Sequence, residues 1–283
     1  MKDSPVFLLA ESGASKTAWR LCHGKNIQHS FESMGLNPSA VTEDELLRAL
    51  DRCFLQLEGK KPASIHFYGA GLKYEENIQL LSKSLYRFFP KALIEIQDDM
   101  TAAVRATGKP EGIVAILGTG SNAAYYKNDV ILENYGGHGY LLGDEGSGMD
   151  LGKQVLKAML DGKLPRELHE YVLRKENMEL GELRTSIYQH KQPNRRLAAL
   201  APYLKYADKY PEVHKLIQSR FEQFIETTIQ RVSNYQNLKV DFVGGIACHF
   251  TADLLYVCKK YGLECDKFIQ APIDKLVEYH YNP

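Results

Sequence analysis

The chain has 283 residues, of which 44% are hydrophobic and 25% charged, and lysine plus arginine equal aspartate plus glutamate at 35 each. This composition is typical of a globular protein with room for two lobes. The balanced charge argues against nucleic-acid partners and against attraction to anionic membranes. No apolar run approaches the roughly 20 residues that a membrane-spanning helix needs, so we expect no membrane partner either.

The amino terminus and the cysteines together predict a cytoplasmic protein. The first five residues lead straight into an apolar run and are too short for a signal peptide. The cysteines are odd in number, scattered and without a CxxC pair, which predicts reduced thiols. They are Cys22, Cys53, Cys248, Cys258 and Cys265.

The first predicted hairpin carries the first candidate site. Residues 6–10 form an apolar run typical of a buried strand, and residues 18–22 alternate as a second strand. The turn between them has small residues that let backbone N–H groups approach an anion, and Ser15, Lys16 and Thr17 add side-chain donors. It is not a Walker A loop, because no glycine precedes Lys16. A plain hairpin tip would look similar, and Lys16 could be a solvated lysine, so both interpretations stay open here.

The rest of the first half alternates between helix and strand. Thr42 and Glu45 form a capping box that predicts the start of an amphipathic helix. The other expected elements are a third strand within 24–33, a break at 35–38, a strand over 65–68, a helix over 75–89, a strand over 93–97 and a helix over 101–106. The strand over 93–97 ends on Asp98 and Asp99, at the strand end where open α/β sheets bind ligands. An N-cap aspartate is the simpler interpretation of either carboxylate taken alone.

The second half repeats this order of elements. An apolar run over 113–117 breaks at a glycine–hydroxyl turn, 118–122, and resumes over 123–126. A glycine-rich loop, 136–148, holds His138, Asp144 and Glu145 and leads into a helix over 149–160, where a carboxylate could also cap the helix. The remaining expectations are a helical middle over 165–235 with a long helix through 213–232, a strand over 239–243 ending on Gly244 and Gly245, a helix over 250–261 and a short helix over 272–279.

Two lobes that each open on a meander and a phosphate-type turn resemble the actin–hexokinase–acetate kinase superfamily. Residues 136–147 more specifically resemble the N-acetylglucosamine kinase family, within the BadF/BadG-type ATPase group, and the similarity runs from Leu8 to Gly245. The resemblance implies an α/β fold of two RNase H-like lobes, each a mixed sheet flanked by helices, with the active site in the cleft between the lobes. The lobes would be 1–109 and 110–283, with a helical insertion at about 160–238 and a last helix able to pack back on the first lobe.

The resemblance also implies an activity: ATP-dependent transfer of the γ-phosphate to the 6-hydroxyl of an amino sugar, above all N-acetylglucosamine. Asp99 would be the catalytic base, and Mg²⁺ would bind through water near Glu11. ATP would be held by Gly13, Ser15, Lys16, Thr17, Gly118, Thr119, Gly120, Ser121, Gly244 and Gly245. The sugar would be held by Asn37, Asp99, Gly137, His138, Asp144 and Glu145. A homodimer stays open.

Three positions depart from the family pattern. Glu11 stands where most of the superfamily has aspartate, Ala18 where bacterial relatives often have an acid, and His138 where a tryptophan is usual. The alternatives are a kinase for glucosamine, N-acetylmuramic acid or another cell-wall sugar, a BadF/BadG-type activator ATPase, and a sugar-sensing regulator. An activator would need cysteines for an iron–sulfur cluster, and no suitable cysteine pair is present. A regulator would be expected to carry an added DNA-binding segment, which the chain lacks.

Overall fold

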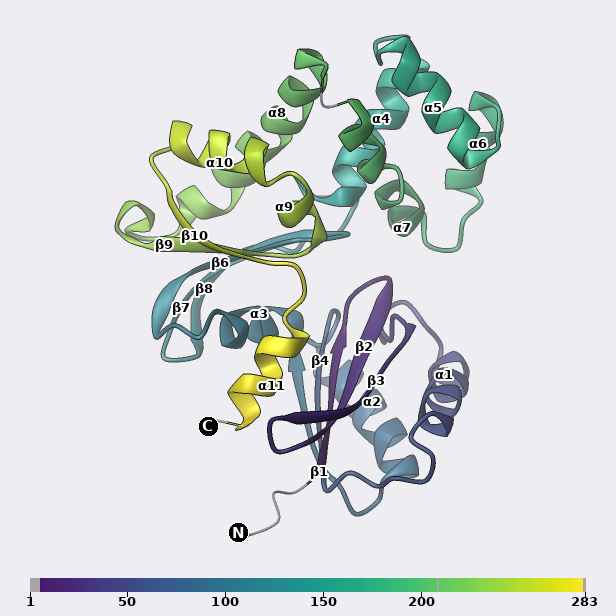
Figure 1. The fold of residues 1–283 in the computed structure, drawn as a ribbon, viewed down its shortest axis with the longest axis vertical. Helices are drawn as coiled ribbons and strands as arrows, with labels where there is room; N and C mark the ends of the chain where they lie inside the picture. Colours follow the sequence, from purple (N-terminus) through teal and green to yellow (C-terminus); the bar gives the residue numbers. More distant parts are fainter. Residues whose placement is uncertain (1–5, 208, 282–283) are drawn as a thin grey trace. The chain divides into compact units, whose positions relative to one another are not determined.

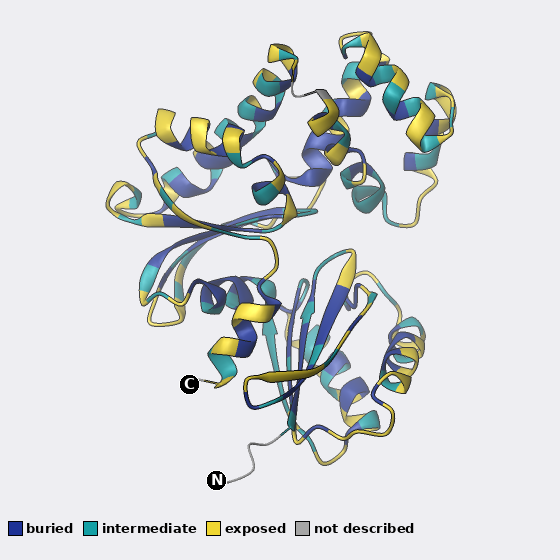
Figure 2. Ribbon diagram, viewed as in Figure 1, coloured by how far each residue is buried: buried dark blue, intermediate teal, exposed yellow. Residues whose placement is uncertain are grey.

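The computed structural model describes residues 6–207 and 209–281 (Figure 1). The chain forms two compact units. Unit 1 consists of the described parts of Met1–Lys109 and Ala271–Pro283, and unit 2 of those of Pro110–Gln270. Each unit contains one five-stranded sheet flanked by helices. A mixed sheet with flanking helices in each lobe is what the resemblance implied. Buried residues gather on the strands and on the helix sides that face them (Figure 2).

Unit 1 has the strand order β3-β2-β1-β4-β5. Its strands are β1 (Val6–Ser12), β2 (Lys16–His23), β3 (Asn26–Met34), β4 (Ser64–Gly69) and β5 (Leu93–Asp98). The first three strands form an antiparallel meander, and β1, β4 and β5 are parallel. This is the RNase H-like arrangement, and it brings the carboxyl ends of β1, β4 and β5 to one edge of the sheet.

Alternation along β1 explains how helices cover both faces of this sheet. Leu8 and Ala10 belong to a core that contains residues of α1 (Glu43–Leu55) and α2 (Glu75–Phe88). Phe7 and Leu9 belong to a second core with residues of α3 (Asp99–Thr107) and α11 (Ile273–Tyr281). Successive side chains of a strand point to opposite faces, so α1 and α2 cover one face while α3 and α11 cover the other. The final helix therefore packs on unit 1.

Unit 2 repeats the arrangement, with strand order β10-β9-β6-β7-β8. Its strands are β6 (Glu111–Leu117), β7 (Ser121–Lys127), β8 (Val130–Gly136), β9 (Lys239–Val243) and β10 (Glu264–Ile269). Its helices are α4 (Gly148–Leu160), α5 (Arg166–Glu176), α6 (Leu180–Tyr188), α7 (Pro193–Ala198), α8 (Pro211–Thr227), α9 (Gly245–His249) and α10 (Thr251–Lys260), with 3-10 segments at Ala201–Ala207, Ile229–Arg231 and Tyr235–Asn237. No helix among the described residues is long and apolar enough to cross a bilayer.

One expectation in unit 2 was wrong in detail, and two short elements were not expected. The long helix expected through 232 ends at Thr227, and a 3-10 segment follows. The helix expected over 250–261 is α10, and an unexpected short helix, α9, precedes it. Strand β10 was not expected, because its sequence Glu-Cys-Asp-Lys-Phe-Ile places charged residues on an edge strand and lacks the alternation that marks a half-buried one.

Candidate active site

Two neighbouring carboxylates at the end of β5 have different surroundings. Asp98 is the N-cap of α3, and its Oδ1 accepts a hydrogen bond of 2.7 Å from the Thr101 amide. Asp99 is the first residue of that helix and is partly exposed. The cap therefore uses Asp98, and Asp99 is the carboxylate that can reach a ligand at this edge of the sheet.

Asp99 also lies close enough to Glu11 for their charges to interact. Burial, followed by the charge of Asp98, raises the pKa of Asp99 to about 6, and Lys73 opposes the rise. Burial, followed by the charge of Asp99, raises the pKa of Glu11 to about 7, and Lys16 opposes it. A carboxylate with a pKa near neutrality is poised to accept a proton. Two crowded carboxylates also suit Mg²⁺, a hard cation that prefers oxygen ligands and relieves the repulsion between them.

Lys73 was not singled out from the sequence. It follows the turn that ends β4, beside β5 in the sheet, so its charge reaches Asp99 from a neighbouring strand end. The sequence could have indicated Lys73, because it closely follows Gly69, Ala70 and Gly71, and turns at the carboxyl ends of parallel strands lie close together.

The first turn is packed tightly against the chain that follows β3. The Gly13 amide donates to the Lys16 carbonyl at 2.9 Å, closing the turn. A Cβ on Gly35 would lie 2.6 Å from the Gly13 carbonyl oxygen, so only glycine fits there. The Ser12 hydroxyl is 2.8 Å from that of Thr17 in a buried pair. Thr17 is therefore part of the framework of the turn, and the residues at its tip are Gly13, Ala14 and Ser15.

Lys16 and Asn37 both make contacts inside unit 1. The Lys16 amine pairs with Glu32 at 2.6 Å, and both side chains are more than half exposed. Asn37 Oδ1 accepts a hydrogen bond of 2.9 Å from the Ser39 amide. A Cβ on Gly71 would lie only 2.1 Å from the same oxygen, so Asn37 packs directly against that glycine. The loop that carries Asn37 is thus fixed against the turn after β4, whose strand adjoins the one that leads to Asp99.

The second turn is held by the helix that follows the glycine-rich loop. The Gly118 amide donates to the Gly120 carbonyl at 3.0 Å. The carbonyls of Gly118 and Thr119 accept the amides of Gly148 and Met149, at 2.8 and 3.1 Å. Residue 148 begins α4, so these carbonyls satisfy two amides of the first helical turn. The turn and the start of α4 thus form one rigid piece.

Asp144 and Glu145 are both joined to the strand that follows this turn. Asp144 Oδ1 accepts the Ser121 amide at 3.0 Å, and the Ser121 hydroxyl donates to the Glu145 carbonyl at 2.8 Å. Burial raises the pKa of Asp144, and the Ser121 amide opposes that rise. A Cβ on Gly120 would lie 2.9 Å from Asp144 Oδ1. The carboxylate that the resemblance placed around the sugar therefore lies against the phosphate-type turn.

His138 and Gly137 lie on the outer part of the same loop. His138 is exposed, and a Cβ on Gly143 would lie 3.2 Å from His138 Cβ and 3.8 Å from Glu145 Oε2. The Gly137 amide donates to the Ser121 carbonyl at 3.1 Å. Polar groups of the loop thus gather beside the second turn, where a sugar hydroxyl or amide could find donors and acceptors.

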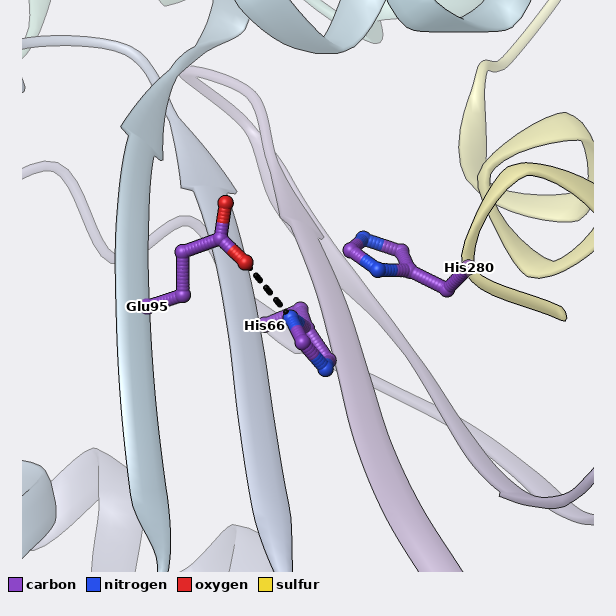
Figure 3. Close-up of side chains that lie close together, drawn as sticks. All are labelled: His66, Glu95 and His280. Atoms are coloured by element: carbon purple, nitrogen blue, oxygen red, sulfur yellow. Dashed lines mark hydrogen bonds and ion pairs between the residues drawn. The ribbon is translucent and has the colours of Figure 1, made fainter. Parts of the chain in front are cut away.

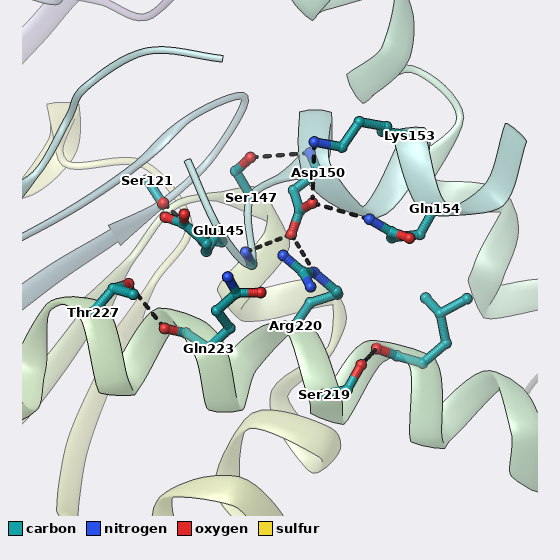
Figure 4. Close-up of polar contacts among 12 residues, drawn as sticks. Ser121, Glu145, Ser147, Asp150, Lys153, Gln154, Ser219, Arg220, Gln223 and Thr227 are labelled. Carbon is teal, nitrogen blue, oxygen red and sulfur yellow. Dashed lines mark hydrogen bonds and ion pairs between the residues drawn. The ribbon is translucent and has the colours of Figure 1, made fainter. Parts of the chain in front are cut away.

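A buried ion pair between α4 and α8 holds the end of the glycine-rich loop (Figure 4). Asp150 on α4 is 2% exposed and lies 2.6 Å from Arg220 Nε on α8. The other partners of its carboxylate include the Gly146 amide at 3.0 Å and the Gln154 amide at 3.4 Å. Sequence patterns did not reveal this pair, because the two residues are 70 positions apart.

Gly244 lies against the end of β6. Its φ is +117°, and a Cβ there would be 2.4 Å from the Leu117 carbonyl oxygen, immediately before the second turn. Gly245 is exposed and starts α9. Unit 2 therefore brings together the second turn, the loop carrying Asp144 and Glu145, and the Gly244 turn, while unit 1 brings together Glu11, Asp99, the first turn and Asn37.

Two RNase H-like units, each opening on a hairpin with a glycine–hydroxyl turn, define the actin–hexokinase class of fold, to which many sugar kinases belong. Comparison with known proteins agrees. A glucokinase of the ROK family from Streptomyces griseus, solved with glucose and AMPPNP, shares this fold with a TM-score of 0.57, 12% identity and 97% coverage of both chains.

A nearer structural match narrows the class to a family. The crystal structure of a candidate N-acetylglucosamine kinase from Porphyromonas gingivalis is 33% identical, has a TM-score of 0.92 and covers 98% of this chain and 99% of that one. The chain belongs to the N-acetylglucosamine kinase family, as its resemblance predicted. An N-acetylmuramic acid/N-acetylglucosamine kinase of Clostridium acetobutylicum is 28% identical over 131 residues, which cover 44% of this chain and 43% of the relative. No family model matches the sequence.

Proposed function

We propose that this chain is an ATP-dependent kinase that transfers the γ-phosphate to the 6-hydroxyl of N-acetylglucosamine. The observation that carries the proposal is the pair Glu11 and Asp99, in a chain 33% identical to a candidate N-acetylglucosamine kinase. Asp99 takes the proton of the attacking hydroxyl, while Asp98 caps the helix behind it. The two turns, including Gly13, Ser15 and Lys16 in unit 1 and Gly118 to Ser121 in unit 2, hold the phosphates, and Gly244 and Gly245 hold the adenosine.

Mg²⁺ would be held near Glu11, where it would neutralise charge on the phosphate oxygens. A negative carboxylate close to a phosphate repels that phosphate, and a bound cation would relieve the repulsion. Without a cation, burial and the charge of Asp99 raise the pKa of Glu11, as is expected of a site that suits a cation. Asn37, Gly137, His138 and Glu145 contact the sugar in this proposal, and Asp144 positions the second turn for it.

N-acetylmuramic acid is the second candidate substrate, because the Clostridium relative is named for both sugars. Its extra lactyl group is on the 3-oxygen, so the same 6-hydroxyl is available for attack. Asp99 serves either substrate in the same way. The two candidates differ only in what the residues around the sugar accept.

The test is a coupled ADP-release assay with N-acetylglucosamine, N-acetylmuramic acid, glucosamine and glucose, and NMR of the product to locate the phosphate. Asp99→Asn should lower kcat by about 100- to 10,000-fold, the usual contribution of a positioned base. Asp98→Asn is the matched control, because asparagine caps a helix as well as aspartate does. Equal losses in both variants, or preference for a sugar without the acetamide, would refute the proposal.

A further inference from the structure

Unit 1 contains a cluster of two histidines and a carboxylate outside the proposed active site (Figure 3). His66 on β4, Glu95 on β5 and His280 on α11 each offer one ligand atom, and these atoms all lie within 4.8 Å of one another. His66 and Glu95 are register partners on adjacent parallel strands, and His66 Nδ1 is 2.9 Å from Glu95 Oε2. The ring of His280 lies 3.9 Å, centroid to centroid, from that of His66. Three elements distant in sequence thus meet at one point.

One nitrogen of each imidazole has a hydroxyl partner. The Ser64 hydroxyl lies 3.2 Å from His66 Nε2, and the Tyr68 hydroxyl lies 2.8 Å from His280 Nε2. Histidines that bind metals nearly always have such an outer partner, which fixes the tautomer and the orientation of the ring. For His66, this leaves Nδ1, the nitrogen that faces Glu95, on the metal side.

The charges of the cluster select the kind of metal. Arg105 Nη1 donates to Glu95 Oε1 at 3.0 Å, which neutralises the one carboxylate and leaves its other oxygen facing His66. A hard cation such as Mg²⁺ or Ca²⁺ prefers several oxygens and gains little here. Two imidazoles and one carboxylate oxygen are instead the ligands that Zn²⁺ and related transition metals bind.

We propose that His66, Glu95 and His280 form a binding site for Zn²⁺ or a metal of similar ligand preference, which fastens α11 to the sheet of unit 1. Water completes the coordination. The site shares no residue with the proposed active site, so metal binding can be tested without an activity assay. Its effect is on stability, because a metal bound only by the folded state raises the melting temperature.

The experiment uses the full chain after treatment with EDTA. Zn²⁺ is titrated in competition with a chromophoric chelator, Co²⁺ is added separately to record the visible bands of a tetrahedral site, and thermal melting is followed with each metal and with Mg²⁺. We expect one equivalent of Zn²⁺ to bind and the melting temperature to rise with Zn²⁺ but not with Mg²⁺. His66→Asn and His280→Asn should each weaken binding by more than about tenfold, and Tyr68→Phe by about tenfold, as for the loss of an outer-shell partner.

Two controls separate this site from adventitious binding. His214→Asn removes a histidine from a pair with Asp253 in unit 2, where Nδ1 lies 2.9 Å from Oδ1, and should leave Zn²⁺ binding unchanged. Cys265→Ser removes a free thiol and should also have no effect. No stoichiometric binding, or binding that survives both His66→Asn and His280→Asn, or binding lost with Cys265→Ser would overturn the proposal. If one ligand variant does not fold, the other decides.

Discussion

Replacing Arg220 by methionine tests whether the buried ion pair under the glycine-rich loop holds unit 2 together. Methionine keeps most of the length of the side chain but removes the cation, so Asp150, which is 2% exposed, becomes a buried charge without its nearest partner. Breaking a buried pair from one side costs about 3–5 kcal/mol. Arg220 is 20% exposed, and Asp150 keeps the Gly146 amide and the Lys153 amine, the latter 3.9 Å away, so we expect the lower end, about 3 kcal/mol at neutral pH.

Urea denaturation followed by circular dichroism measures this loss. Arg166→Met is the matched control, because Arg166 pairs with Glu170 at 2.7 Å but the two side chains are 92% and 62% exposed. Exposed pairs contribute about 0–1 kcal/mol, so this control should lose little. The double variant Asp150→Asn/Arg220→Met should recover most of the stability, because the buried charge that lost its nearest partner is then absent. A loss below about 1 kcal/mol, a loss equal to that of Arg166→Met, or a double variant no more stable than Arg220→Met would refute the reasoning.

Three further predictions follow from the same structure. The folded-state pKa of Glu11, about 7, is above its usual value of 4.5, so its contribution to stability is present in acid and lost as the pH rises through 7. Glu11→Gln should therefore be more stable than wild type at pH 8, by about 3 kcal/mol in urea denaturation, and equal to it near pH 4. Asp98→Asn removes a charge that raises the pKa of Asp99, so the acid limb of its pH–rate profile should move to lower pH, and an unchanged limb would contradict this. Gly244→Ala forces a Cβ to 2.4 Å from a carbonyl oxygen and should abolish folding of unit 2 or nucleotide binding, measured by calorimetry, whereas Gly262→Ala, with positive φ but open space, should cost only about 1–2 kcal/mol.

Local signals in the sequence predicted most of the fold correctly. The capping box at Thr42 and Glu45 is present in the structure and begins α1, and the strand over 93–97 ends at Asp98 as expected. Such features depend on neighbours within four residues, so the sequence contains all the information they need. Strand β10 has no such signal, because its place in the sheet comes from parallel pairing with β9 across about 25 residues of chain.

The residues of the candidate site also fall into two groups, those that local sequence patterns indicate and those that matter only through tertiary contacts. Asp99 and the two glycine turns could be proposed from the sequence, because carboxylates at strand ends and glycines between strands have a meaning that does not depend on distant residues. Lys73 and Arg220 were missed, although each carries a charge next to a candidate residue or its loop. Their importance comes only from tertiary contacts, and a solvated lysine or a helical arginine looks the same in the sequence.

The contacts of Asp144 explain why the second turn and the glycine-rich loop are informative as a pair. Gly120 must lack a Cβ because the Asp144 carboxylate occupies that space, and the carboxylate in turn accepts the Ser121 amide. The carbonyls of the turn accept the first amides of α4, which starts four residues after Asp144. The two segments therefore form a single structural piece, and a sequence that has only one of them lacks the partner that satisfies its polar groups. A sequence that matches both the second turn and the glycine-rich loop is strong evidence for the family, because the two segments pack together as one structural unit in which Asp144 holds the turn.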